Sequence, residues 1–205
     1  GQVKSETACY QSIEIKMKIL CAEYNPEGRG TVVPIGDNAL LRNNDDFYIP
    51  DFADRLSCSP QLVLRIGKLG KSVGERFAGR YFQEIGVGIR FYADRLEEEL
   101  HSEGLPAGVG SAFDGCAAIG SLVDKDKCDG TDYAFRVNGK IVYEGSLQEL
   151  PFSAEHLISF ASGFYTLKIG DFLYCGNRFR YRELEPGDRL QICFQGKEWM
   201  DFKLK

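Results

Sequence analysis

Residues 72–123 decide the fold of this chain, and they read SVGERFAGRYFQEIGVGIRFYADRLEEELHSEGLPAGVGSAFDGCAAIGSLV. Inside this stretch, the segment 85–92, IGVGIRFY, places an apolar residue at every second position. A period of two predicts a β-strand with one apolar face. The opposite face carries two glycines and then Arg90. Glycines within a strand mark the close approach of a second backbone or a ligand, so Arg90 is predicted to lie on a face that has a close neighbour.

A short helix is predicted on each side of this strand. Ser72 is expected to be the N-cap of a helix over residues 73–81. After the strand, the acidic run at 97–100 predicts a second helix, which the Gly-Leu-Pro sequence at 104–106 ends. A loop of small residues then leads to the Phe-Asp-Gly sequence at 113–115.

Further short strands are predicted along the rest of the chain. Asn138-Gly139 lies between two alternating arms, which is a strong signal for a β-hairpin over residues 129–143. Ser153 is predicted to cap a helix whose apolar stripe contains Leu157, Phe160, Ala161 and Phe164. The other expected strands are residues 17–22, 31–35, 61–68, 172–175, 189–195 and 199–204. Many short strands and few helices predict a mostly β (α+β) architecture.

Length and composition limit the classes of protein that the chain can belong to. We expect one domain over residues 17–205, preceded by a polar extension at 1–16. A net charge of −5 without a basic patch argues against nucleic acid as a partner. The apolar runs are too short to cross a bilayer, and no secretion signal is seen. The seven cysteines form no Cys-x-x-Cys pair, which favours reduced thiols in a cytoplasmic protein over disulfides or a zinc site.

The order of motifs over residues 61–121 resembles the fumarylacetoacetate hydrolase family. Ala93-Asp94-Arg95, Gly104-Leu105-Pro106 and the segment 113–120, FDGCAAIG, stand where the family has A-R-D, then G-L-P, then F-D and a P-[LV]-G-type segment. The similarity resumes at residues 166–178, TLKIGDFLYCGNR, against the family's T-L-x-x-G-D-x-[IL]-x-T-G-T-P. The resemblance implies the fold of the fumarylacetoacetate hydrolase C-terminal domain, a mixed β-roll or barrel with small peripheral helices. It also implies a homodimer and chemistry that depends on Mg²⁺ or Mn²⁺.

Most positions that carry chemistry in the resembling family hold different residues here. The family's E-x-E glutamates, which ligate the metal, fall on Ser59 and Gln61, and its third carboxylate ligand falls on Arg90. The family's lysine falls on Ser111, and its general-base histidine falls on Arg29. In the family, the metal polarises a keto acid and stabilises the enolate that forms. The resemblance therefore implies the fold more strongly than it implies the activity.

These replacements predict that no Mg²⁺ or Mn²⁺ binds and that no cofactor is held. A hard divalent cation needs anionic oxygens, whereas an arginine stays protonated at any relevant pH. Arg90 is instead predicted to bind the carboxylate of a small organic acid, because a guanidinium holds a carboxylate bidentately. The candidate ligand-binding residues are Arg90, Ser59, Gln61, Ser111, Asp114 and Asn177, and no catalytic residue is assigned. The alternatives are a decayed pocket kept only for folding and an internal ion pair between Arg90 and Glu84 or Asp94.

The sequence leaves three functional hypotheses open. The first is a relative without metal-dependent chemistry that binds a small acid or serves as a structural subunit. The second is an active hydrolase, decarboxylase or isomerase with a rearranged site, acting by C–C bond hydrolysis or by keto–enol or dienoate isomerisation. The third is a structural partner of an active paralogue. Since fold does not establish activity, metal titration and assays on oxaloacetate and acylpyruvates separate the first two.

Overall fold

Strand β5, Phe82–Ala93, lies inside the larger of two β-sheets and carries Arg90. It pairs antiparallel with β4, Leu56–Ile66, on one side and with β6, Ala117–Asp124, on the other. The register places Arg90 directly opposite Ser59, and Gly88 opposite Gln61. The predicted alternation at 85–92 is therefore confirmed, and pairing with β4 brings three of the candidate residues onto neighbouring strands.

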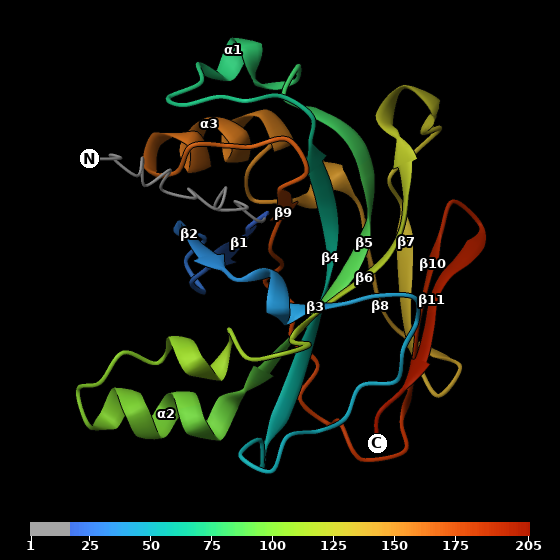
Figure 1. Cartoon of the computed structure of the whole chain (residues 1–205). Coiled ribbons are helices and arrows are strands. Elements are labelled where there is room, and N and C mark those ends of the chain that lie inside the picture. The colour runs from blue at the N-terminus through green and yellow to red at the C-terminus, as the bar shows by residue number, and fades with distance from the viewer. Residues whose placement is uncertain (1–16) are drawn as a thin grey trace, which may run out of the picture.

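The computed structural model describes residues 17–205, so the polar extension expected at residues 1–16 lies outside the described part. Its seven-stranded sheet has the order β2-β1-β9-β4-β5-β6-β3, and its four-stranded sheet has the order β11-β10-β7-β8. Figure 1 shows the two sheets side by side, with helices at the periphery. The remaining strands are β1 Ile19–Tyr24, β2 Gly30–Ile35, β3 Leu40–Leu41, β7 Tyr133–Val137, β8 Lys140–Gly145, β9 Phe172–Tyr174, β10 Arg189–Phe194 and β11 Lys197–Lys203.

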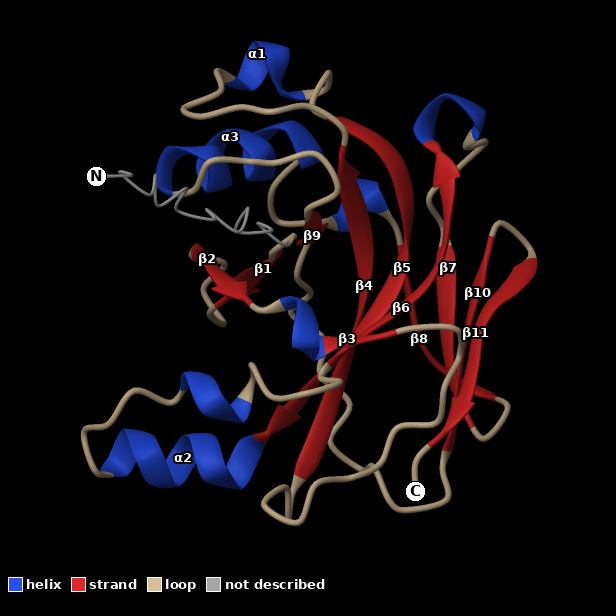
Figure 2. Ribbon diagram, in the orientation of Figure 1, coloured by secondary structure: helices blue, strands red, loops and turns tan. Residues whose placement is uncertain are grey.

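The helices are few and short, as Figure 2 shows. The α-helices are α1 Glu75–Ala78, α2 Asp94–Ser102 and α3 Ala154–Phe164, and the 3-10 helices are η1 Asp37–Ala39, η2 Gly108–Gly110, η3 Lys125–Lys127 and η4 Leu147–Glu149. None of the helices of residues 17–205 has the length and apolar character that crossing a bilayer requires. The expectation of a mostly β protein with small peripheral helices is confirmed.

The glycines of β5 are explained by close packing against the protein itself. A Cβ on Gly86 would lie 2.4 Å from the carbonyl oxygen of Ser121, and one on Gly88 would lie 2.7 Å both from the carbonyl oxygen of Ala118 and from the ring of Tyr174. The Tyr174 hydroxyl crosses this position to donate a hydrogen bond to the Ala118 carbonyl at 2.9 Å. The predicted close neighbour of this face is therefore β6 together with the side chain of Tyr174.

Local sequence patterns predict some helix ends and turns correctly and others wrongly. Asn138 and Gly139 both have positive φ, as the predicted hairpin requires, and the Ser153 side chain caps α3 by accepting from the amide of His156. Ser72, however, has a φ of 49° and is not a helix cap. Helix α1 begins three residues later, at Glu75, because Gly74 is its N-cap.

The apolar stripe predicted for α3 is buried only in part. Leu157 and Ala161 are buried, whereas Phe164 is 62% exposed at the C-terminal end of the helix. Ile158, which the predicted stripe left out, is fully buried. The helix therefore buries Ile158 in place of Phe164, so its buried face is rotated slightly from the stripe that its largest residues indicate.

Candidate functional site

Arg90 is fully buried, and its guanidinium is held by groups of the chain itself. Nη2 donates to the carbonyl oxygen of Ser111 at 2.6 Å and lies 3.8 Å from a carboxylate oxygen of Glu23. Nη1 lies 3.9 Å from the Sγ atom of Cys116. Nε is buried and has no hydrogen-bond partner among the described residues. A buried charge must be paired, and here the pairing is internal.

Glu23 connects Arg90 to a second layer of charge. The hydroxyl of Tyr92 donates to the Glu23 carboxylate, at 3.0 Å and 3.3 Å to its two oxygens. The guanidinium of Arg180 lies over the Tyr92 ring, with 3.7 Å between Cζ and the ring centroid, a cation–π contact. Charges of opposite sign therefore alternate from Arg90 through Glu23 to Arg180.

Asp94 ends this sequence of contacts. Its carboxylate is almost fully buried and accepts hydrogen bonds from Arg180 at 3.2 Å, from Arg182 at 2.7 Å and from the Ser57 hydroxyl at 2.8 Å. The sequence A-D-R at 93–95 therefore supplies a buried anion to a pair of arginines. We call Glu23, Arg90, Tyr92, Asp94 and Arg180 the Arg90 cluster.

Ser59, Gln61 and Asn177 lie beside the Arg90 cluster, and each already has a partner in the backbone. The Ser59 hydroxyl donates to the carbonyl of Phe179 at 2.9 Å, and the Gln61 side-chain oxygen accepts from the amide of Gly176 at 3.0 Å. The Asn177 side-chain amide donates to the carbonyl of Pro60 at 2.8 Å. These three side chains join β4 to the segment after β9, so a ligand would have to displace an existing hydrogen bond to use them.

Ser111 and Asp114 have different places. Ser111 contributes its backbone carbonyl to Arg90 rather than its hydroxyl. Asp114 is exposed on the loop before β6, and its carboxylate accepts a hydrogen bond from the Asn38 side-chain amide. The structure thus places Ser59 and Gln61 on the strand beside Arg90 and bonds the Ser111 carbonyl to Arg90, whereas the side chain of Asn177 is bonded to Pro60 and Tyr133, and that of Asp114 to Asn38.

Burial sets the protonation state of the groups around Arg90. Burial raises the pKa of the Cys21 thiol to about 12, and the nearby Arg90 only partly opposes this shift. Burial also raises the pKa of Tyr92 well above its ordinary value, and the charge of Glu23 adds to that shift. Both groups are therefore neutral at physiological pH, so Arg90 is balanced by Glu23 rather than by a thiolate or a phenolate.

The residues at the family's metal position do not fit a divalent cation. The three positions implied as carboxylate ligands hold a hydroxyl, an amide and a guanidinium. Among residues 17–205, no three His, Cys, Asp or Glu side chains are grouped so that they could hold a metal ion. Mg²⁺ and Mn²⁺ need carboxylate oxygens, and the fixed positive charge of Arg90 would repel them.

The internal partner of Arg90 is not the one expected from the sequence. Glu84 pairs with Arg65 at 3.0 Å, and Asp94 pairs with Arg180 and Arg182. The ion pair is made instead by Glu23, which is 67 residues away in sequence and lies on β1, three strands from β5 in the order β1-β9-β4-β5. One signal in the sequence could have identified this partner: Glu23 is the only charged residue of β1, and it follows four residues that are buried.

Comparison with known proteins is consistent across sequence and structure. The family described as fumarylacetoacetate (FAA) hydrolase C-terminal matches residues 19–201. An uncharacterized protein of Pyrococcus abyssi is 30% identical over 78% of this chain and 72% of its own length. The mitochondrial oxaloacetate tautomerase of Mus musculus is 26% identical over 90% of this chain and 87% of its own length.

Solved structures show the same fold. A putative fumarylacetoacetate hydrolase family protein from Yersinia pestis has a TM-score of 0.84 at 22% identity, covering 93% of each chain. The fumarylpyruvate hydrolase of Pseudomonas aeruginosa, solved with Mn²⁺ and pyruvate, has a TM-score of 0.82 at 20% identity, covering 91% of this chain and 88% of that one. From the match over residues 19–201 and the shared fold, we conclude that the chain belongs to the fumarylacetoacetate hydrolase family.

Proposed function

We propose that this chain is a family member without the divalent-metal chemistry of its relatives and that it works as a binding or structural protein. The observation that carries the proposal is the burial of Arg90 at a position where the family resemblance implies a carboxylate ligand. Its guanidinium is bonded to the Ser111 carbonyl and paired with Glu23. A charge held in this way stabilises the protein's own interior rather than a bound metal.

The energetics also support a structural role for this arrangement. Removing a charge from water costs several kcal/mol unless partners replace the lost hydration. Here the partners come from β1 and from the loop before β6, which fastens two distant segments to β5. A dication would have to bind beside the fixed positive charge of Arg90 and compete with it for the Glu23 carboxylate, so the proposal predicts that metal does not bind at this position.

Calorimetric titration with Mg²⁺ and Mn²⁺, combined with assays on oxaloacetate and acylpyruvates, tests the proposal. The matched comparison is a variant that restores the family's residues: Ser59→Glu, Gln61→Glu, Arg90→Asp and Ser111→Lys. We expect no saturable metal binding and no metal-stimulated turnover in the natural chain, and metal binding in a folded restored variant. Metal-stimulated turnover by the natural chain would refute the proposal and support the active hydrolase or isomerase instead.

A second candidate function is the binding of a small organic acid at Arg90. It is favoured by Glu23, whose carboxylate lies at the guanidinium while its side chain remains 30% exposed. Rotation of Glu23 toward solvent would expose Nη2, and also Nε, which has no hydrogen-bond partner among residues 17–205, to an incoming carboxylate. In that case Glu23→Gln should tighten the binding of pyruvate or oxaloacetate, and Arg90→Ala should abolish it. Pyruvate binding that is unchanged in Arg90→Ala would rule out this site.

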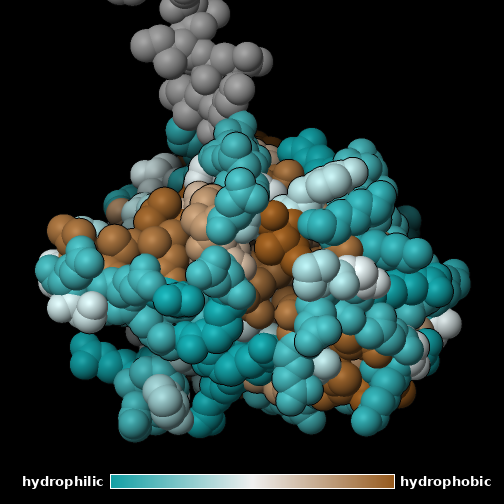
Figure 3. Space-filling model, turned by 90° about the horizontal axis from the view of Figure 1, so that it is seen from below, coloured by the Kyte–Doolittle hydropathy of each residue, from teal (hydrophilic) through white to brown (hydrophobic). Residues whose placement is uncertain are grey.

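We further propose that the chain acts within an assembly, either as a homodimer or as the partner of an active paralogue. Figure 3 shows hydrophobic residues uncovered between hydrophilic ones on the face seen from below. Exposed apolar patches on soluble proteins mark interaction surfaces. Light scattering during gel filtration measures the homodimer, and co-purification with a relative that keeps the E-x-E motif measures the paralogue complex. A monomer in both experiments would exclude the assembly.

A further inference from the structure

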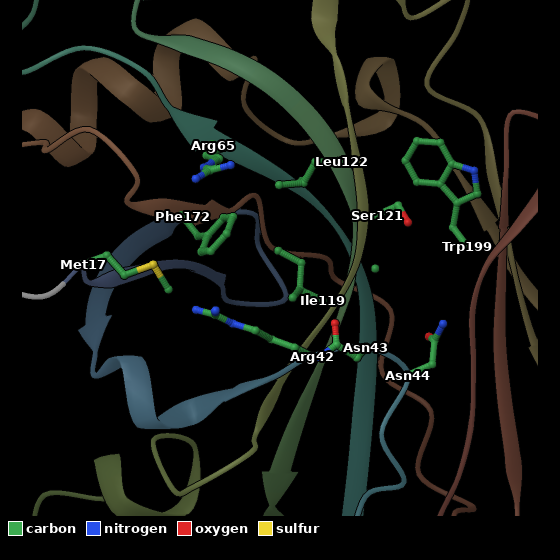
Figure 4. A pocket seen from close by; sticks show the side chains of 11 residues that line it. Met17, Arg42, Asn43, Asn44, Arg65, Ile119, Ser121, Leu122, Phe172 and Trp199 are labelled. Carbon is green, nitrogen blue, oxygen red and sulfur yellow. The ribbon is translucent and has the colours of Figure 1, made fainter.

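A surface cavity of about 330 Å³ lies at the uncovered edge of β6, away from the Arg90 cluster. Strand β3 pairs with β6 only at Ala117 and Ala118, so the next residues of β6 form part of the cavity wall. Figure 4 shows the lining side chains that matter here: Arg42, Arg65, Ile119, Leu122, Phe172 and Trp199. No member of the Arg90 cluster lines this cavity, so it is a separate feature of the molecule.

Arg42 is held at the cavity by a turn of unusual backbone shape. The amide of Asp45 donates to the carbonyl of Arg42 at 3.0 Å, and the two residues between them, Asn43 and Asn44, have φ values of 61° and 54°. Left-handed backbone is uncommon for residues other than glycine and persists where the surroundings enforce it. Here the Asn44 side-chain oxygen accepts from the amide of Asp201 at 3.1 Å, which fixes the turn to β11.

The lining is positively charged around an apolar wall. Figure 4 shows the guanidinium groups of Arg42 and Arg65 at opposite ends of a space bordered by Phe172 and Ile119. Arg65 is paired with Glu84 at 3.0 Å and lies 6.0 Å from the centroid of the Phe172 ring. Among residues 17–205, the Arg42 side chain makes no hydrogen bond or ion pair, and no acidic residue lines the cavity. Within the described part of the chain, the cavity therefore offers a cation without a paired anion beside apolar carbon.

We propose that this cavity binds a small monocarboxylic acid with an aromatic or short aliphatic body. The carboxylate pairs with the guanidinium of Arg42, where both oxygens can accept hydrogen bonds. The apolar body packs against Phe172, Ile119 and Leu122. The volume lies at the lower end of the range of about 300–1,000 Å³ that is typical of small-molecule sites, which favours a compact acid over a peptide or a nucleotide.

Trp199 provides a direct readout, because it lines the cavity and is the single tryptophan of the chain. Benzoate and hexanoate are titrated into the full chain while Trp199 fluorescence and saturation-transfer NMR signals are recorded. Methyl benzoate is the uncharged comparison. We expect saturable binding of the acids, and binding at least tenfold weaker for the ester, the difference that one charged contact of about 1.4 kcal/mol produces.

Two variants and one control make the test specific. Arg42→Gln removes the charge, and Ser121→Phe fills the cavity from β6; each should weaken benzoate binding at least tenfold. Arg76→Gln removes an exposed arginine of α1 and should leave the affinity unchanged. Circular dichroism confirms that each variant is folded. The proposal fails if neither acid binds at millimolar concentration, if the ester binds as well as the acid, or if Arg42→Gln has no effect. It also fails if Ser121→Phe instead dissociates an oligomer, since the cavity is then an interface between copies of this chain.

Discussion

A carboxylate oxygen of Glu23 lies 3.8 Å from Nη2 of Arg90, and this ion pair joins β1 to β5 across the larger sheet. The Glu23 carboxylate is positioned by the hydroxyl of Tyr92, two residues after Arg90 on the same face of β5. The pair occupies the part of the fold where the family resemblance implies a metal. The position where the resemblance implies a carboxylate ligand therefore holds a positive charge, and the contacts of Arg90 with Glu23 and Ser111 stabilise the folded chain.

Replacement of Arg90 should lower stability substantially. Arg90→Ala removes a buried charge, leaves a cavity and takes away the ion-pair partner of Glu23, so we expect the free energy of unfolding to fall by about 3–5 kcal/mol. Arg90→Met keeps most of the volume and should cost less. Urea denaturation measures both values. Arg95→Ala is the control, since Arg95 is 60% exposed and its ion pairs should contribute less than about 1 kcal/mol. Equal costs for Arg90→Ala and Arg95→Ala would show that the buried guanidinium has no structural role.

The half-buried Glu97 should make stability depend on pH. Burial raises the pKa of Glu97 above its ordinary value of 4.5, while a hydrogen bond with Ser111 opposes the shift. A raised pKa means that the folded protein favours the protonated carboxyl group. The stabilisation is fully present below 4.5 and is lost as the pH rises through the folded pKa.

Glu97→Gln removes this titration and keeps the shape of the side chain. Compared with the natural chain, the variant should gain stability progressively as the pH rises from below 4.5 to neutral. Urea denaturation at a series of pH values gives the difference, and Glu98→Gln serves as the comparison because Glu98 is exposed and its pKa is lowered by Arg55. A pH-independent difference for Glu97→Gln would contradict the assignment.

Buried thiols should be unreactive in the folded protein. Burial raises the pKa of Cys21 and of Cys175 to about 12, and that of Cys116 above its ordinary value. Because the thiolate is the reactive form, these cysteines should not react with a disulfide reagent until the chain unfolds. In a Cys9→Ser background, only the half-buried Cys128 and Cys193 should be labelled under native conditions. Rapid native labelling of Cys21 or Cys116 would mean that the Arg90 cluster opens readily.

Gly88 should not tolerate a side chain. An added Cβ would lie 2.7 Å from the Ala118 carbonyl oxygen and 2.7 Å from the Tyr174 ring, so Gly88→Ala should cost about 1–3 kcal/mol. Gly163→Ala is the matched control, because a Cβ there meets nothing within 4 Å among residues 17–205 and α3 favours alanine by about 0.5–1 kcal/mol. Thermal denaturation distinguishes the two. A neutral Gly88→Ala would show that β6 can move away from β5 at small cost.

Local sequence patterns predicted most of the strands but not all of the helix ends. The alternation at 85–92 and the Asn138-Gly139 turn each depend on neighbouring residues, and both predictions are confirmed. The N-cap expected at Ser72 was wrong. Gly70, two residues earlier, forms an isolated β-bridge with Leu167, and this tertiary contact outweighs the capping preference of Ser72. The spacing of Phe164 predicts a buried residue, but Phe164 is the last residue of α3 and is 62% exposed.

The candidate site could be predicted as a set of positions but not as a set of contacts. The motif order placed Ser59, Gln61 and Arg90 together, and the pairing of β4 with β5 does bring them together. The contact between Arg90 and Glu23 depends on the strand order β1-β9-β4-β5, in which β9 comes from the last third of the chain. A period-two pattern identifies which face a residue occupies and carries no information about which strand lies beside it.

The most direct test of the central claim is a crystal structure determined from crystals soaked in millimolar MnCl₂, with an anomalous difference map calculated at the manganese edge. The account predicts no manganese peak beside Arg90 and a guanidinium still bonded to the Ser111 carbonyl and paired with Glu23. A manganese ion coordinated next to Arg90, with Glu23 or Gln61 turned toward it, would contradict the account.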